Sequence, residues 1–221
     1  YEFWQSTMTV LFPDRDFRRE AATFALEELA PPEGMIIAAF EPEPSYVGMT
    51  LAEVAERRGK DAVTVYLELI AEADAIDGRE SIIARSMTTA NIASFLSWPY
   101  TNVSSDGSLA GRHPRGYGAF TRVLAQHVRG RGDLSLETAV RKMTSLAAEN
   151  TGLTGRGTIT EGAFADLVLF DPATVSDRAT PEEPNLPSVG IVGVWVNGER
   201  VYTDANTTGN RPGRILRRGG G

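Results

Sequence analysis

Residues 157–171, GTITEGAFADLVLFD, carry the most distinctive pattern in the sequence. The glycines of this stretch, Gly157 and Gly162, are typical of turns, and the apolar run at residues 165–170 predicts a buried strand. Residues 157–159 predict another short strand. Because strands follow one another here without an intervening helix, this part of the chain has a different architecture from what precedes it.

Downstream of this stretch the strand pattern continues. Residues 191–196 are apolar and β-branched, and Asn197-Gly198 is typical of a two-residue hairpin turn leading into residues 199–202. The four prolines at residues 171–188 predict a long surface excursion. The chain ends in a basic, arginine-rich tail.

Upstream of the stretch, helical and strand patterns alternate, which is typical of an α/β protein with a parallel sheet or barrel and helices outside. Thr50 and Glu53 have the spacing of a capping box, and Asp61 is expected to cap the next helix, with Val65, Leu69 and Ile70 facing inward. Helices are predicted at residues 16–30, 89–96, 117–128 and 136–143, and strands at residues 35–40, 81–85 and 101–105.

Composition excludes several classes of protein. The 221 residues carry a net charge of −7, which disfavours a nucleic-acid partner in spite of the arginine-rich tail. No apolar run approaches the roughly 18 to 20 residues that span a bilayer, so we expect a soluble protein without a membrane partner. The chain has no cysteine, which favours the cytoplasm and excludes a disulfide framework. Its two histidines, His113 and His127, cannot supply a zinc site of three imidazoles.

Asp106 is the first candidate for a chemical role. It follows the strand predicted at residues 101–105, and in parallel barrels the carboxyl ends of the strands face the active site. Ser105-Asp106-Gly107 is also common turn chemistry, in which the aspartate accepts nearby backbone amides. The residues alone leave both interpretations open.

Arg115 lies in the dense segment RHPRGYG at residues 112–118. A guanidinium beside a barrel mouth suits bidentate binding of a substrate carboxylate. A solvated arginine or a structural ion pair is the competing interpretation, and His113 is equally suited to packing.

The chain resembles the N-acyl-D-amino-acid deacylase (D-aminoacylase) family of the amidohydrolase superfamily. The resemblance rests on residues 157–171 together with residues 105–107, 113–115, 142–149 and 196–198, and it covers nearly the whole chain. It implies a zinc-dependent hydrolase that cleaves the amide bond of N-acyl-D-amino acids.

The resemblance also implies roles for particular residues. Asp106 would shuttle the proton of the catalytic water and contact a second metal weakly, and Arg115 would bind the α-carboxylate of the substrate. Ser6 would lie beside that carboxylate, and Tyr1 would be the remnant of an aromatic motif that contacts substrate. Asp166 and Asp171 are expected to be architectural.

The chain departs from the family pattern because the His-x-His motif, the cysteine ligand and the later histidine ligands are absent. We therefore expect the C-terminal half of a deacylase: the last βα units of a TIM-like (β/α)8 barrel at residues 1–154, and the C-terminal strands of a small β-sandwich with the basic tail at residues 155–221. Most zinc ligands would lie outside this chain, and the complete protein could form oligomers.

Other functions remain open at this point. The chain could be a non-catalytic paralogue or a subunit that completes a barrel. It could also belong to a related cyclic amidase of the dihydroorotase or hydantoinase type, although His113-Pro114-Arg115 favours the deacylases.

Overall fold

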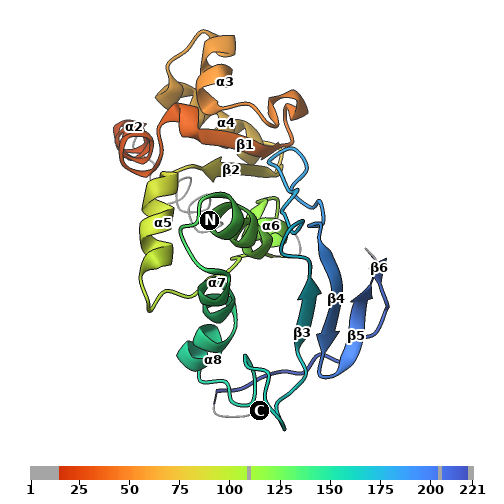
Figure 1. The fold of residues 1–221 in the computed structure, drawn as a ribbon. Coiled ribbons are helices and arrows are strands. Elements are labelled where there is room, and N and C mark those ends of the chain that lie inside the picture. The colour runs from red at the N-terminus through yellow and green to blue at the C-terminus, as the bar shows by residue number, and fades with distance from the viewer. Residues whose placement is uncertain (1–14, 109–110, 204–205, 219–221) are drawn as a thin grey trace. The chain divides into compact units, whose positions relative to one another are not determined.

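A computed structural model describes residues 15–108, 111–203 and 206–218 (Figure 1). The chain divides into two compact units, Tyr1–Thr88 and Thr89–Gly221. This division lies well before the boundary predicted after residue 154, which falls inside the second unit. The assignment of residues 1–154 to a barrel and residues 155–221 to a sandwich stays a prediction.

The first unit consists of helices around one short β-ribbon. Its main elements are α2 (Arg15–Phe24) with its π-helical extension η1 (Ala25–Leu29), β1 (Met35–Phe40), α3 (Leu51–Arg58), α4 (Ala62–Asp74) and β2 (Glu80–Ala84). The helix predicted at residues 16–30 is present, but its buried face carries Ala22, Ala25 and Leu26. Phe17 and Phe24 of the same helix are exposed.

The predicted helix caps of this unit are confirmed. The Thr50 hydroxyl accepts a hydrogen bond from the Glu53 amide, and the Glu53 carboxylate accepts one from the Thr50 amide at 2.6 Å. Asp61 accepts the Thr64 amide at 3.0 Å at the start of α4. Each cap satisfies amides that have no partner inside the first helical turn.

The two strands of the first unit pair antiparallel, so the parallel pairing expected for successive βα units is wrong here. Met35 lies opposite Ala84 and Phe40 opposite Glu80, so the connection from β1 to β2 starts and ends at the same end of the ribbon. That connection contains two helices, α3 and α4, instead of the single crossover helix of a βαβ unit. Apolar periodicity identifies a strand but carries no information on its direction.

The core of the first unit surrounds β1 on both faces, in keeping with the continuous apolar run at residues 35–40. Met35 and Ile37 join a large cluster that includes Leu51, Val54, Val65 and Leu69. Ile36 and Ala38 form a second cluster with Ile83. A register shift between Ile37 and Ala39 brings Phe40 to the first cluster.

The second unit combines helices with an antiparallel sheet. Its elements are α5 (Thr89–Ser97), α6 (Arg115–Arg122) with its extension η4 (Val123–Gly130), α7 (Leu136–Met143), α8 (Ser145–Thr151), β3 (Leu167–Phe170), β4 (Ile191–Val196), β5 (Glu199–Thr203) and β6 (Asn206–Thr207). The helices at 89–96, 117–128 and 136–143 are confirmed. No helix of the described residues is long and apolar enough to cross a membrane.

Two strands predicted in the second unit are absent. Residues 101–105 and 157–159 are irregular, without ladder partners. A strand requires a neighbouring strand for its backbone groups. Residues 101–103 contact a helix instead of a strand. The backbone carbonyl of Lys142 on α7 accepts a hydrogen bond from the Val103 amide at 3.2 Å.

The sheet has the order β3-β4-β5-β6, visible at the blue end of the chain in Figure 1. Asn197 and Gly198 have φ values of 48° and 84°, which confirms the predicted hairpin turn between β4 and β5. The predicted burial of β3 is wrong: Val168 and Leu169, which point to opposite faces, are 56% and 53% exposed. β3 is an edge strand, and within the described part of the unit it lacks a covering layer.

Candidate functional site

The candidate site forms where the loop after α5 meets the start of α6. The side chains of Asp106 and Arg115 form an ion pair between Oδ2 and Nη2. Asp106 has a φ of 46°, in the left-handed region that aspartate tolerates better than most residues. The structure therefore brings together the two residues that the sequence placed in a site, nine positions apart.

A pair of glycines permits this approach. A Cβ atom on Gly107 would lie 2.7 Å from the Cα of Gly116, so the two backbones touch directly beside Asp106 and Arg115. A larger side chain at Gly107 would force the loop away from α6, whereas a Cβ atom on Gly116 would lie 3.5 Å from the Gly107 Cα, an ordinary contact. Sequence reasoning missed this contact, although each glycine adjoins a candidate residue.

His113 supports the start of α6 and has no direct contact with the Asp106 carboxylate among the described hydrogen bonds. Its Nδ1 accepts the Arg115 amide at 3.1 Å. Burial lowers the pKa of His113, and the nearby guanidinium groups of Arg115 and Arg122 lower it further. A neutral imidazole fits its role as an acceptor. The structure shows a half-buried His113 that is bonded to the backbone at the start of α6.

The segment at residues 171–188 anchors α6 from the other side. The Arg122 guanidinium pairs with the Asp177 carboxylate at 2.6 Å, and the Thr121 and Ser188 hydroxyls lie 2.7 Å apart. This surface excursion, predicted from its prolines, thus buries Asp177, whose side chain is 8% exposed. It fixes the helix whose first residue is Arg115.

Both groups of the candidate site are accessible to a ligand. The Asp106 and Arg115 side chains are 77% and 47% exposed. A carboxylate next to a guanidinium can accept a proton and bind an anion at one place. Tyr1 and Ser6, the other predicted substrate contacts, lie outside the described residues.

A metal site cannot be built from the described residues alone. Among them there is no group of three or more histidine, aspartate, glutamate or cysteine side chains that could hold an ion. His127, the other histidine, is buried and its Nδ1 lies 2.8 Å from Asp133. Asp106 would be at most one ligand of a metal held mainly by other residues.

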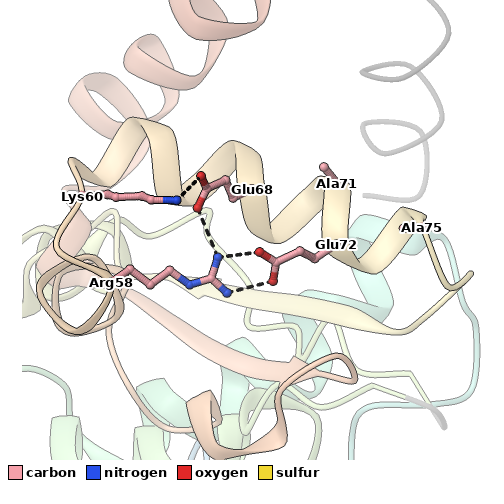
Figure 2. A pocket seen from close by; sticks show the side chains of 6 residues that line it. All are labelled: Arg58, Lys60, Glu68, Ala71, Glu72 and Ala75. Carbon is pink, nitrogen blue, oxygen red and sulfur yellow. Dashed lines mark hydrogen bonds and ion pairs between the residues drawn. The ribbon is translucent and has the colours of Figure 1, made fainter.

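A hollow away from Asp106 and Arg115 lies on the first unit and is shown in Figure 2. It has a volume of about 570 Å³ and is lined by Arg58, Lys60, Glu68 and Glu72 together with two alanines. Arg58 bonds both carboxyl oxygens of Glu72, at 2.7 and 2.8 Å, and Lys60 pairs with Glu68 at 2.6 Å. The charged groups satisfy one another, so this hollow is an ion-pair network that joins α3 to α4.

Asp166 and Asp171 hold turns near the sheet. Asp166 pairs with Arg156 and accepts the Asn197 amide at 2.8 Å, and Asp171 accepts the Ala173 amide at 2.9 Å. The hydrogen bonds from the Ala173 amide and the Thr174 hydroxyl lower the pKa of the Asp171 carboxyl. Neither aspartate joins Asp106 in the described contacts.

Comparison with known proteins identifies the family of this chain. The model of the amidohydrolase family matches residues 10–202. The chain belongs to the amidohydrolase family, in agreement with the resemblance noted from its motifs.

Its relatives within that family are deacylases of N-acyl-D-amino acids. An N-acyl-D-aspartate deacylase of Alcaligenes xylosoxydans xylosoxydans is 45% identical over 73% of this chain and 33% of its own length. A D-aminoacylase of the same organism is 43% identical over 83% of this chain and 37% of its own length. The chain thus spans about a third of the length of these relatives.

Solved structures agree with this assignment. The crystal structure of a D-aminoacylase superimposes with a TM-score of 0.73 at 40% identity, covering 83% of this chain and 38% of its own. An N-acyl-D-glutamate deacylase from Bordetella bronchiseptica, solved with zinc and a phosphonate inhibitor that mimics the tetrahedral intermediate, gives 0.72 at 38% identity over 90% of this chain and 39% of its own.

Proposed function

We propose that the protein containing this chain is a zinc-dependent hydrolase that cleaves the amide bond of N-acyl-D-amino acids. The observation that carries the proposal is the contact between Asp106 and Arg115, found in a chain that shares 43–45% identity with deacylases of such substrates. The chain would be the C-terminal half of the enzyme and would contribute the last units of its barrel and the end of its β-sandwich.

Residues outside this chain would supply most of the zinc ligands, because the described residues do not form a metal cluster. Support for zinc comes from the Bordetella deacylase, which was solved with that ion.

Arg115 would orient the substrate. An N-acyl amino acid carries an α-carboxylate next to the scissile amide, and a guanidinium can bind a carboxylate through two parallel hydrogen bonds. Asp106 engages Nη2, and a guanidinium has five N–H donors, so Arg115 can hold the substrate while it stays near Asp106. This places the scissile carbonyl close to the proposed base.

Asp106 would move the proton. Its carboxylate would accept a proton from the attacking water as the water oxygen bonds to the carbonyl carbon. The same proton would then pass to the amide nitrogen as the carbon–nitrogen bond breaks. The products are a free D-amino acid and the carboxylate of the acyl group.

A substrate panel tests the proposal on the complete protein. Because relatives at nearly equal identity are named for different substrates, the panel contains N-acetyl derivatives of D-aspartate, D-glutamate and D-methionine. Each is compared with its L enantiomer and its α-carboxamide. We expect release of free D-amino acid only when the carboxylate is present. Equal hydrolysis of the carboxamides would contradict the role of Arg115, and no release from any D substrate would overturn the function.

A further inference from the structure

Lys142 on α7 is buried in an unusual way. Its side chain belongs to a residue that is 1% exposed, and no carboxylate of the described residues forms an ion pair with it. The ammonium instead donates to the backbone carbonyl oxygens of Trp98 and Thr101, the latter at 2.9 Å. A buried charge without a counter-ion is costly and needs a compensating role.

Three hydrogen bonds connect Lys142 to one segment of backbone. Besides the two from its ammonium, the Lys142 carbonyl accepts the Val103 amide at 3.2 Å. The segment from Trp98 to Val103 overlaps the strand predicted at residues 101–105, which does not form. Lys142 therefore supplies the backbone partners that a neighbouring strand would have supplied.

This segment leads directly to the candidate site. Asp106 lies three residues after Val103, and Val103 packs in the same cluster as Ala139 of α7. The side-chain amide of Asn150 on α8 also donates to the Asn102 side chain at 2.9 Å. The position of Asp106 thus depends on how firmly α7 and α8 hold the residues before it.

The choice of lysine fits this geometry. The only other lysine of the chain is Lys60, and all remaining basic side chains apart from the histidines are arginines. An ammonium is compact and directs three donors at carbonyl oxygens, whereas the planar guanidinium needs more room. Burial lowers the pKa of Lys142, as expected for an ammonium removed from water.

We propose that Lys142 is a positioning residue, which fixes the backbone from Trp98 to Val103 and thereby holds Asp106 beside Arg115. The catalytic part of this inference rests on the proposed function. The structural part, the hold on the backbone, does not.

Amide hydrogen exchange in the intact protein tests whether Lys142 fixes the backbone from Trp98 to Val103. In Lys142→Met, which keeps the length and the aliphatic stem of the side chain, we expect the amides of residues 100–106 to exchange about tenfold faster or more, because the Trp98 and Thr101 carbonyls lose a donor. Lys60→Met, the same change at an exposed lysine, should leave these amides unchanged. Leu146→Ala, which opens a cavity in α8 without removing a hydrogen bond, should not reproduce this local pattern.

Turnover tests the catalytic part. We expect Lys142→Met to lower kcat about 10²-fold while KM changes by less than about threefold, because misplacing the base affects the chemical step more than binding through Arg115. Lys142→Gln, which retains two donors, should fall between wild type and Lys142→Met in both readouts and serves if the methionine variant does not fold.

The outcomes separate the two proposals. Unchanged exchange at residues 100–106 in Lys142→Met or Lys142→Gln would overturn the role of Lys142. Faster exchange with unchanged kcat would show that the hold does not act on Asp106. If wild type hydrolyses no N-acyl-D-amino acid, the proposed function fails while the exchange result still decides whether Lys142 holds the segment.

Discussion

Asp106 and Arg115 show how two exposed side chains acquire a fixed relation to each other. Their contact depends on Gly107, whose backbone lies too close to Gly116 for a larger side chain at position 107, and on His113, which binds the Arg115 amide. The candidate residues followed from local motifs, whereas their contact partners did not. A close approach between two glycines is a property of the folded backbone and leaves no periodic trace in the sequence.

Asp106→Asn tests whether Asp106 acts as the catalytic base. The variant keeps the shape of the side chain but cannot accept a proton, so we expect turnover of N-acetyl-D-amino acids by the complete enzyme to fall about 10²-fold or more. Circular dichroism should be unchanged. Turnover near the wild-type rate would remove Asp106 from the mechanism.

Arg115→Lys tests the anion-binding group. An ammonium cannot reproduce the two parallel bonds of a guanidinium, so we expect KM to rise about tenfold or more with a smaller change in kcat. Steady-state kinetics with a D substrate and with its α-carboxamide measure the effect. Arg211→Lys, an equivalent change in the exposed tail, is the control and should leave KM at the wild-type value.

At the scale of elements, the local signals of the sequence were reliable and the non-local ones were not. The capping box at Thr50, the cap at Asp61 and the turn at Asn197-Gly198 were predicted and are confirmed, because each depends on residues within a few positions of one another. The strands predicted at 101–105 and 157–159 are absent, since a strand forms only where another strand meets it.

Thr50→Ala tests the cap of α3. Loss of the hydroxyl removes the acceptor for the Glu53 amide and should weaken the helix by about 1 kcal/mol. Amides at the start of α3 should then exchange about fivefold faster. Thr23→Ala, near the end of α2 where η1 continues the helix, should change little, because its hydroxyl only bonds the carbonyl one turn earlier. Equal effects of the two changes would contradict the cap.

At the scale of the whole molecule, the family was predictable and the arrangement was not. Motifs spread from residue 105 to residue 198 identified the amidohydrolases, which the family match over residues 10–202 confirms. The antiparallel pairing of β1 and β2 and the exposure of β3 were missed. Strand direction and sheet burial depend on connections and covering layers that apolar periodicity does not encode.

We predict that the 221-residue chain alone binds no zinc at submicromolar concentration. A catalytic zinc site needs about three protein ligands, and the described residues gather no such group. Calorimetric titration of the purified, metal-free chain measures this. A stoichiometric submicromolar site would show that the chain holds its own metal.

Acid should destabilise both units. The Glu53 carboxylate accepts hydrogen bonds from the Thr50 amide and hydroxyl, which lower its pKa. The bonds from Arg131 and His127 lower the pKa of Asp133. A carboxyl whose pKa is lower in the folded state stabilises the fold above its ordinary pKa of roughly 4, and this contribution is lost as the pH falls through the lowered value. We therefore expect the urea midpoint to fall steadily below about pH 5.

Glu53→Gln separates this titration from the cap itself. Glutamine can still serve the capping box but does not ionise. Exchange of the α3 amides between pH 5 and pH 3, corrected for intrinsic rates, should depend less on pH in this variant than in wild type. An unchanged pH dependence would remove Glu53 from the acid response.

The burial of Lys142 has a consequence for proteolysis. An endoprotease that cleaves only after lysine finds two bonds in this sequence, after Lys60 and after Lys142. Lys60 lies in the short loop between α3 and α4 with its side chain 49% exposed, whereas Lys142 cannot enter an active site while α7 is intact. The first cut thus records accessibility, and the delay before the second records how often the helix opens. The time between the two cuts therefore measures the local unfolding of α7.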